Sequence, residues 1–251
     1  MRGFRNALTR VGFCALGAVY AGVGYLAIRV AVAGARDRVT GFGGSFRYFL
    51  ERPSGSLLVG GIAAGLAAFT LGRLLEVADP KRSFLSKIRS FVDALAHAAM
   101  AWGAIALLLR LRRGPSTRSL LAWLLARPWG VTLLEIAGAV VILIGAIQMI
   151  QAISGRLSNL PRKTSLGAAA PVVLKAGRFG YFARGSVSAI IGWFLIRTAV
   201  DLDPRNYHDI GAALGVIEHV RFGGLLLGFA GVGLIAYGGY LLVLGLVRIR
   251  A

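Results

Sequence analysis

Six long apolar stretches constrain the fold of this chain more than any other feature of its sequence. They cover residues 11–33, 56–78, 90–109, 130–153, 179–200 and 222–247. Each is close to the roughly 20 residues that an α-helix needs to cross a bilayer, and only a helix or a closed barrel satisfies its backbone hydrogen bonds there. The stretches are too long and unbroken for barrel strands. The sequence therefore predicts an all-α membrane protein with six transmembrane helices.

The composition excludes several other classes of protein. Charged residues make up 16% of the 251 residues, against about a quarter in soluble domains. The single cysteine, Cys14, excludes an intrachain disulfide and a cysteine-based metal site. The first apolar stretch has the small residues of a signal-peptide cleavage site at 31–33, an alternative that we disfavour because this stretch is repeated later. Since no catalytic or cofactor-binding motif occurs, we expect no enzyme activity, no cofactor and no metal.

The chain contains an internal repeat. With a constant offset of 168 residues and no gap, residues 10–29 align with residues 178–197, and Gly65 then falls on Gly233 in the next apolar stretch. The third and fourth stretches follow the same plan more loosely, with Arg89 falling on Arg10 at an offset of 79. Such spacing predicts three tandem two-helix repeats. Their boundaries are placed at 1–79, 80–155 and 156–251.

Each repeat carries a short segment before its second long helix. Aromatic and leucine residues lie among charges at 46–51, 120–125 and 214–219. We expect short helices in the membrane interface there, because their apolar side would be buried while their charges reach water. The second helix then begins at Arg52-Pro53-Ser54-Gly55 in the first repeat and at Arg127-Pro128-Trp129-Gly130 in the middle one.

These motifs carry a resemblance to a known family. The R-x-G-[FY]-x-A-x-G start, the R-P-x-G entry and the G-L-x-A-[FY] string resemble the bacterial membrane family called domain of unknown function 1206, which is built from three such modules. The middle repeat departs from the pattern, since it has Phe91 and Ala96 in place of two glycines and lacks the last string. The resemblance implies this architecture and an inner-membrane location, and it assigns no activity.

Two helices in each repeat would give all three repeats the same orientation. Such a parallel array differs from the inverted repeats of many secondary transporters. Lys and Arg outside the helices number 14 on the side of both termini and 11 on the other side, which predicts cytoplasmic termini. The net charge of +19 indicates contact with anionic lipid headgroups and not with nucleic acid.

Ionisable side chains inside the apolar stretches are the candidate site residues, because charges are costly in lipid. Asp93 and His97 lie one helical turn apart and form a possible titrating pair. The alternative is that Asp93 faces Arg89 at the interface and His97 bonds a neighbouring helix. Glu135 and Arg184 complete the candidates, and we expect no direct pair between them because they enter from opposite leaflets.

A second polar position recurs in the second helices of the repeats. Arg73 and Glu76 are spaced for a local ion pair. At an offset of 75 the middle repeat has Gln148 and Gln151 there, whereas the last repeat has leucines. The sequence therefore does not support a symmetric ion site.

Glycines spaced seven residues apart predict close helix contacts. The pairs are Gly17/Gly24, Gly138/Gly145, Gly185/Gly192 and Gly231/Gly238. Seven residues are about two helical turns, so each pair lies on one face of its helix, where small residues let membrane helices approach. A gated pore would use the same glycines as hinges, which stays an alternative.

Packing motifs outnumber polar clusters in this sequence. That balance favours a non-enzymatic scaffold or accessory membrane component, bound to another membrane protein or to a second copy of itself. The alternative is a small-solute or ion permease with its path between the repeats, which would need a cavity that reaches the four candidate residues.

Overall fold

The computed structural model describes residues 2–33, 42–80, 82–109, 117–155, 166–203 and 223–246. This part of the chain is helical with short turns, and its six long helices are long and apolar enough to cross a membrane. They are α1 (Arg2–Ala33), α3 (Gly55–Val77), α4 (Phe84–Leu108), α6 (Gly130–Ile153), α7 (Ala170–Val200) and α9 (Gly223–Leu246). The predicted all-α membrane protein with six candidate spans is confirmed.

Several long helices begin before the apolar stretch that predicts them. Helices α1 and α7 each begin nine residues earlier than expected, at positions again separated by 168 residues. Helix α4 begins at Phe84 because the side chain of Ser83 accepts a hydrogen bond from the backbone N–H of Ser86, which caps the helix N-terminus. Hydropathy marks the lipid-sized part of a helix, while capping decides where the helix starts.

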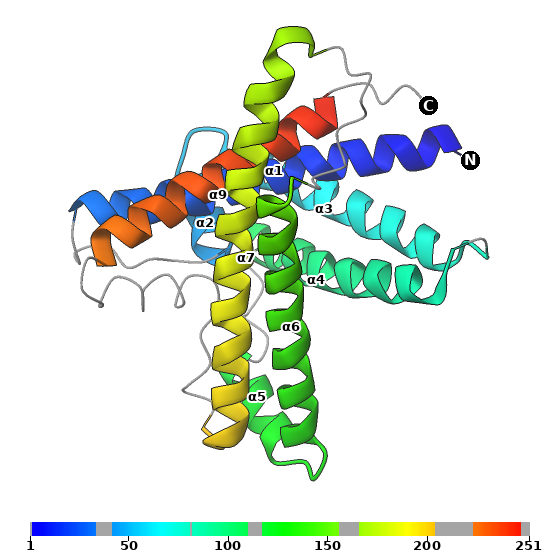
Figure 1. Ribbon diagram of the computed structural model, residues 1–251, viewed down its shortest axis with the longest axis vertical. Coiled ribbons are helices and arrows are strands. Elements are labelled where there is room, and N and C mark those ends of the chain that lie inside the picture. Colours follow the sequence, from blue (N-terminus) through cyan, green and yellow to red (C-terminus); the bar gives the residue numbers. More distant parts are fainter. Residues whose placement is uncertain are drawn as a thin grey trace.

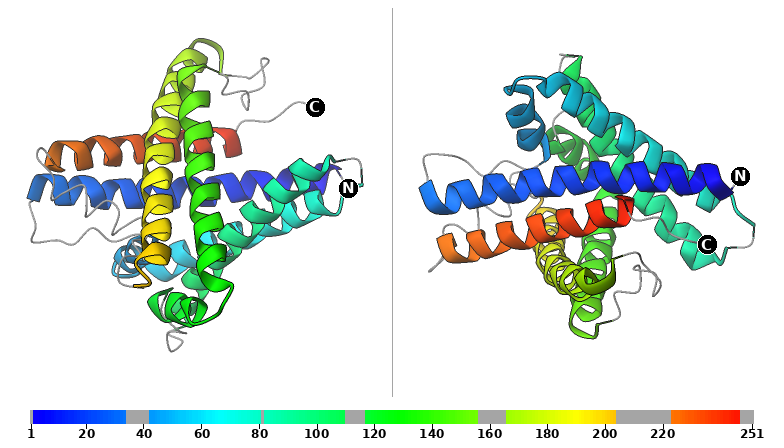
Figure 2. Two further views of the ribbon diagram at one scale, coloured as in Figure 1. Left: turned by 60° about the horizontal axis from the view of Figure 1, so that its bottom comes forward. Right: turned by 90° about the horizontal axis from the view of Figure 1, so that it is seen from above.

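The long helices pack as three antiparallel pairs, and each pair joins two different repeats (Figure 1). The first long helix of one repeat lies along the second long helix of another: α1 along α9, α4 along α3, and α7 along α6. The α1/α9 pair runs across the α6/α7 pair in Figure 1 and in the left-hand view of Figure 2. Helices from both ends of the chain thus lie side by side.

In two of the pairs, an arginine about two turns inside one helix bonds the C-terminal end of its partner helix. Arg10 of α1 donates from Nε to the carbonyl oxygen of Gly245 at 2.8 Å and also bonds that of Leu246. Arg178 of α7 bonds the last carbonyls of α6 in the same way, with 2.7 Å to Ala152 and 2.8 Å to Ile153. A cation at a helix C-terminus is favourable because the last carbonyls lack partners.

The contacts inside the middle repeat differ from those inside the other two. Helix α1 packs on α3 within the first repeat, and α7 packs on α9 within the third. No comparable packing joins α4 and α6 in the described residues, although both belong to the middle repeat, which was predicted as a helical hairpin.

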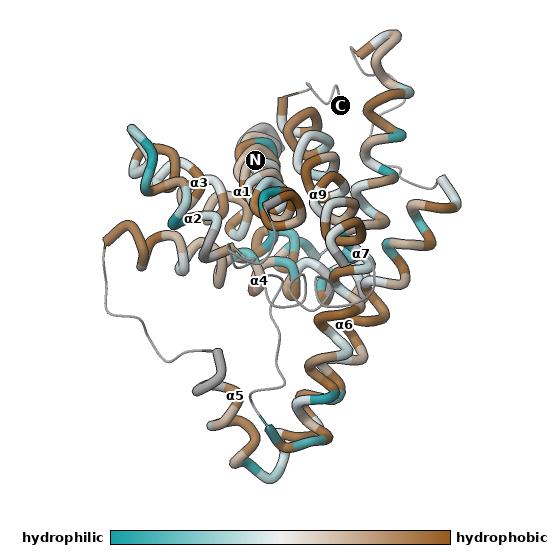
Figure 3. The backbone as a smooth tube through the Cα atoms, turned by 90° about the vertical axis from the view of Figure 1, so that its left-hand side faces the viewer, coloured by the Kyte–Doolittle hydropathy of each residue, from teal (hydrophilic) through white to brown (hydrophobic). Residues whose placement is uncertain are grey.

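Apolar side chains fill the centre of the fold and also cover its outside. The main buried cluster lies where α1, α3 and α9 meet, and it includes Val19, Leu66 and Leu234, which are fully buried. Large apolar side chains such as Trp102 and Leu143 are exposed. Figure 3 shows hydrophobic residues along the whole length of the long helices, as expected for helices that face lipid.

Two of the three predicted short helices are described. Helix α2 (Phe42–Leu50) packs on α1, α3 and α4, with Phe46 buried and Arg47 exposed, and α5 (Thr117–Leu125) precedes α6. The third, at 214–219, lies outside the described residues. A 3₁₀ turn, η1 (Gly167–Ala169), leads into α7.

The R-P-x-G motifs form the same turn after both short helices. The backbone N–H of Gly55 donates to the carbonyl of Arg52 at 2.8 Å, and that of Gly130 donates to the carbonyl of Arg127 at 3.0 Å. A Cβ on either glycine would overlap the backbone carbonyl of Phe49 or Leu124. Glycine is therefore required for the chain to turn so tightly.

Candidate functional site

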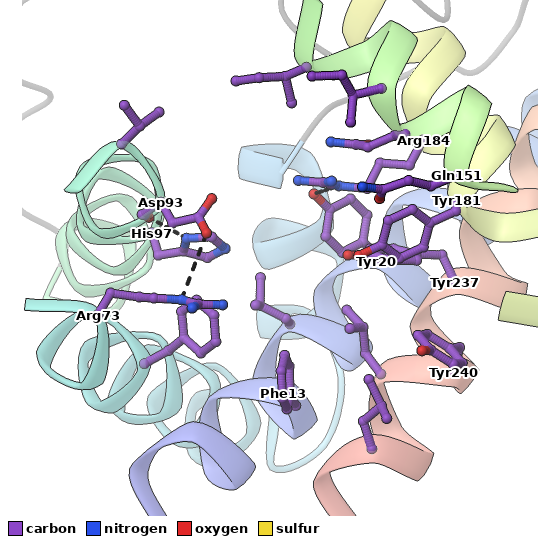
Figure 4. A pocket seen from close by; sticks show the side chains of 18 of the residues that line it. Phe13, Tyr20, Arg73, Asp93, His97, Gln151, Tyr181, Arg184, Tyr237 and Tyr240 are labelled. Carbon is purple, nitrogen blue, oxygen red and sulfur yellow. Dashed lines mark hydrogen bonds and ion pairs between the residues drawn. The ribbon is translucent and has the colours of Figure 1, made fainter. Parts of the chain in front are cut away.

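A cavity of about 610 Å³ lies between the three helix pairs and receives side chains from all six long helices (Figure 4). Many of its walls are built from equivalent positions of the three repeats. The sets are Phe13, Val92 and Tyr181; Phe69, Ile144 and Tyr237; and Arg73, Gln148 and Leu241. Because each set has one member from each repeat, the cavity lies where the repeats meet, and its chemistry differs from one repeat to the next.

Arg184 of α7 forms one side of the cavity together with tyrosines. Its Nε donates a hydrogen bond to the hydroxyl of Tyr20 on α1 at 2.9 Å. Its guanidinium carbon lies 5.6 Å from the ring centroid of Tyr20 and 5.3 Å from that of Tyr237 on α9. Such cation–π contacts stabilise a desolvated arginine. The charge is held at the junction of three helices by neutral partners.

Asp93 and His97 of α4 lie on the opposite side of the cavity, next to Arg73 (Figure 4). The Asp93 carboxylate is 3.7 Å from Nε of Arg73 on α3. His97 Nδ1 is 2.5 Å from the backbone carbonyl oxygen of Asp93, and its ring centroid is 4.7 Å from that of Phe69. Since a carbonyl oxygen only accepts, Nδ1 carries the proton of this bond. The two side chains therefore form no carboxylate–imidazole pair.

Glu76 stabilises the side of the cavity that α3 and α4 form. Its carboxylate accepts hydrogen bonds from Arg73 Nη1 and from Ser90 Oγ of α4, both at 2.9 Å, and it lies 3.4 Å from Arg82. The predicted ion pair between Arg73 and Glu76 is confirmed. The carboxylate joins α3 to α4, while Nε of Arg73 faces Asp93.

Three buried polar atoms on cavity residues have no hydrogen-bond partner in the described part of the chain. They are Nε of Arg73, Oε1 of Gln148 and the hydroxyl of Tyr240. Buried polar groups are almost always hydrogen-bonded in folded proteins. Nε of Arg73 faces the Asp93 carboxylate at 3.7 Å, beyond hydrogen-bond distance, so Gln148 and Tyr240 are the cavity residues in the described part of the chain that have a buried polar atom without any partner.

The structure brings together three of the four candidate residues. Asp93, His97 and Arg184 line the same cavity, whereas Glu135 of α6 does not. No ion pair joins Glu135 to Arg184 among the described residues. Asp93 contacts Arg73 of the neighbouring helix, and the Arg89 side chain lies outside the described part.

Sequence reasoning did not find the tyrosines. Tyr20, Tyr181, Tyr237 and Tyr240 read as ordinary packing residues of apolar helices. The offset of 168 contains a signal, since it aligns Tyr181 with Phe13 and Tyr237 with Phe69, and all of these residues line the cavity. Where one repeat has phenylalanine and another has tyrosine at the equivalent position, the tyrosine hydroxyl makes that side of the cavity polar.

The eight glycines predicted for helix packing face one another across two of the pairs. Gly17 and Gly24 of α1 lie against Gly238 and Gly231 of α9. A Cβ on Gly17 would lie 2.7 Å from the carbonyl oxygen of Gly238. Gly185 and Gly192 of α7 face Gly145 and Gly138 of α6 in the same way. The helix backbones come too close for any side chain at these positions.

Comparison with known proteins places the chain in a family. The family described as Domain of Unknown Function (DUF1206) matches it three times, over residues 11–78, 88–155 and 179–248. The chain belongs to this family. The predicted three-repeat membership is thereby confirmed.

A bacterial protein resembles this chain over most of its length. The uncharacterized protein YxxB of Bacillus subtilis (strain 168) is 27% identical over 248 residues, which cover 95% of this chain and 90% of that protein. No solved structure matches the chain. The family is one of unknown function and this relative is uncharacterized, so the cavity is the guide to function.

Proposed function

We propose that this membrane protein binds an anionic ligand in the central cavity and passes it across the membrane between its three repeats. The observation that carries the proposal is Arg184, which lines the cavity and contacts neutral groups, Tyr20 and Tyr237, in the described part of the chain. An arginine inside a membrane protein is costly and usually functional. An anion beside it offsets that cost, because opposite charges attract strongly where the dielectric constant is low.

The size and polarity of the cavity favour a permease over a scaffold. Protein interiors are packed as densely as organic crystals, and a cavity of about 610 Å³ falls in the range of small-ligand sites, about 300–1,000 Å³. Its unpaired polar atoms support a polar occupant. A scaffold or accessory protein, held by helix contacts alone, needs neither feature, and nothing in the cavity supports an enzyme.

The three repeats would provide the path. Helices of all three repeats line the shared cavity, and parallel repeats also occur among transporters. The excess of Lys and Arg on the side of both termini supports cytoplasmic termini. The family resemblance supports a bacterial inner-membrane location.

A thermal unfolding experiment tests the proposal. The purified protein in neutral detergent is heated in sodium phosphate and in sodium chloride of equal ionic strength. A ligand that binds only the folded state raises Tm, so phosphate should stabilise the wild type and not the Arg184→Gln variant. Arg197→Gln is the matched control, because Arg197 lies on the same helix and pairs with Asp201 outside the cavity.

Two results would contradict this proposal. One is equal stabilisation of the Arg184→Gln variant and the wild type by phosphate. The other is recovery of a protein partner in stoichiometric amount from mild detergent, together with proteoliposomes that take up no radiolabelled phosphate. That second pair of observations would support the scaffold.

A further inference from the structure

The cavity opens toward the outside between α4 and α6. These helices of the middle repeat do not pack on each other as α1 and α3 or α7 and α9 do. Five apolar side chains of α4 and α6 line the cavity and are 36–44% exposed. They are Ile88, Val92, Val140, Ile144 and Ile147. We call this opening the α4/α6 seam.

In a membrane protein, an apolar opening between two spanning helices faces lipid. The α4/α6 seam therefore gives hydrocarbon a way into the cavity, while it presents a barrier to a hydrated ion because apolar walls do not replace lost water. The far side of the cavity has the opposite character, with Arg184 and its tyrosines (Figure 4). The cavity thus combines apolar side chains along the α4/α6 seam with a cation beside the tyrosines of α1 and α9.

We infer that the ligand of this cavity is a lipid with an acidic head group, which enters through the α4/α6 seam. Its head group binds beside Arg184, and its acyl chain lies between the apolar side chains of α4 and α6. This inference rests on the proposed function, which requires only an anion in the cavity. It adds the chemical class of the ligand and the route by which it arrives.

The unpaired atoms of the cavity narrow the choice of head group. Nε of Arg73 already faces the Asp93 carboxylate at 3.7 Å, so Arg184 is the cation that an acidic head group would meet, and Oε1 of Gln148 needs a donor. A phosphodiester supplies acceptors, and a hydroxyl or amino group on the same head supplies the donor. A second copy of the chain or a partner helix in the seam would cover its apolar walls and still leave the Arg184 charge without a counter-ion and Oε1 of Gln148 without a donor in the described part of the chain.

Native mass spectrometry of the full chain in neutral detergent tests this inference with three probes. Phosphatidylglycerol has an anionic head with hydroxyl donors, phosphatidylcholine lacks both net charge and donors, and glycerol 3-phosphate is a head group without a tail. We expect one phosphatidylglycerol to stay bound to the wild type. Its affinity should fall at least about tenfold in Arg184→Gln, as expected for loss of a charged hydrogen bond.

Variants in the seam separate this site from lipid bound elsewhere on the surface. Ile144→Trp should narrow the seam and weaken phosphatidylglycerol binding by a similar factor. Ile150→Trp is the matched control, because Ile150 is exposed on the same helix and does not line the cavity. If Arg184→Gln fails to fold, two other variants still test the inference. Arg184→Lys keeps the charge and should keep phosphatidylglycerol bound, whereas Ile144→Trp should weaken its binding.

Each result has one meaning for the inference. Loss of bound phosphatidylglycerol in Arg184→Gln and Ile144→Trp, with binding kept in Ile150→Trp, supports it. Arg184-dependent binding of glycerol 3-phosphate without binding of phosphatidylglycerol overturns it and leaves the proposed function standing. Absence of Arg184-dependent binding of any probe overturns both, and a dimer cross-linked through the seam overturns the entry route.

Discussion

At the scale of single residues, burying the charge of Arg184 inside the helix bundle costs free energy. Arginine stays protonated at any pH that a protein meets, so the fold has to stabilise the cation instead of neutralising it. It does so with the hydroxyl of Tyr20 and with two tyrosine rings. A ligand anion adds to this stabilisation without competing with a carboxylate on the same wall.

The Tyr20 hydroxyl should therefore matter for stability. Tyr20→Phe keeps the ring and removes the acceptor at 2.9 Å from Arg184 Nε. We expect a loss of about 1.5–3 kcal/mol in the free energy of unfolding, as for hydrogen bonds to charged groups. Chemical denaturation in detergent measures it. Tyr25→Phe is the control, because its exposed hydroxyl bonds another hydroxyl at 3.3 Å, and an equal loss there would contradict the account.

Glu76 carries the other charged contact at this scale. Glu76→Gln keeps the shape and removes the charge that faces Arg73 and Arg82. Because the arginines would lose a partly buried counter-ion, we expect about 1–3 kcal/mol of destabilisation in the same denaturation experiment. Glu51→Gln, at an exposed position, should change stability by less than about 0.5 kcal/mol. A Glu76→Gln variant as stable as the wild type would show that this network is dispensable.

At the scale of helices, the three pairs are held together in two different ways. In α1/α9 and α6/α7 the glycines let backbones touch, and an arginine caps the partner's last carbonyls. The α3/α4 pair has no such glycine contact in its described part, since a Cβ on Gly61 or Gly103 would meet nothing within 4 Å. The Glu76 network links this pair instead.

The glycine pairs give a matched comparison. Gly17→Ala and Gly192→Ala would place a Cβ 2.7 Å from a backbone carbonyl oxygen, so we expect about 1–3 kcal/mol of destabilisation from overpacking. Gly61→Ala and Gly103→Ala meet open space and should stabilise by up to about 1 kcal/mol through helix propensity. Thermal unfolding of the four variants checks both signs, and a uniform effect would contradict the assigned contacts.

The sequence predicted the long helices but not which of them pack against each other. Apolar length predicted every long helix, and glycine spacing predicted which faces pack. Spacing on one helix carries no information about which helix lies opposite, so the pairing of α1 with α9, across the whole chain, appeared only in three dimensions. The site could be predicted only in part for the same reason. Charged side chains are rare in apolar helices, so Asp93, His97 and Arg184 could be predicted. Tyr20 and Gln148 could not, because their place in the cavity depends on which helices lie next to them.

At the scale of the whole molecule, the proposed function depends on divergence between the repeats. Equivalent positions hold arginine, glutamine and leucine, or phenylalanine, tyrosine and isoleucine. A symmetric ring would have placed three like charges around one cavity, where they would repel each other. The middle repeat also lacks the helix contact that closes the other two, and so provides the α4/α6 seam.

The orientation of the whole chain gives one further prediction. The positive-inside rule and the even number of candidate spans predict that both termini lie in the cytoplasm. Green fluorescent protein fused to either terminus should fluoresce in bacterial cells, and alkaline phosphatase fused there should be inactive. Active phosphatase at one terminus alone would contradict six spans, and activity at both would reverse the orientation.

The central claim is that the three repeats surround a cavity that holds an anionic ligand on Arg184. An experimental density map of the protein in nanodiscs made with phosphatidylglycerol tests it most directly. We predict non-protein density beside the Arg184 guanidinium, continuous with a chain that leaves between α4 and α6. A map in which side chains fill the cavity and Arg184 forms an ion pair with a carboxylate of the protein would contradict the claim.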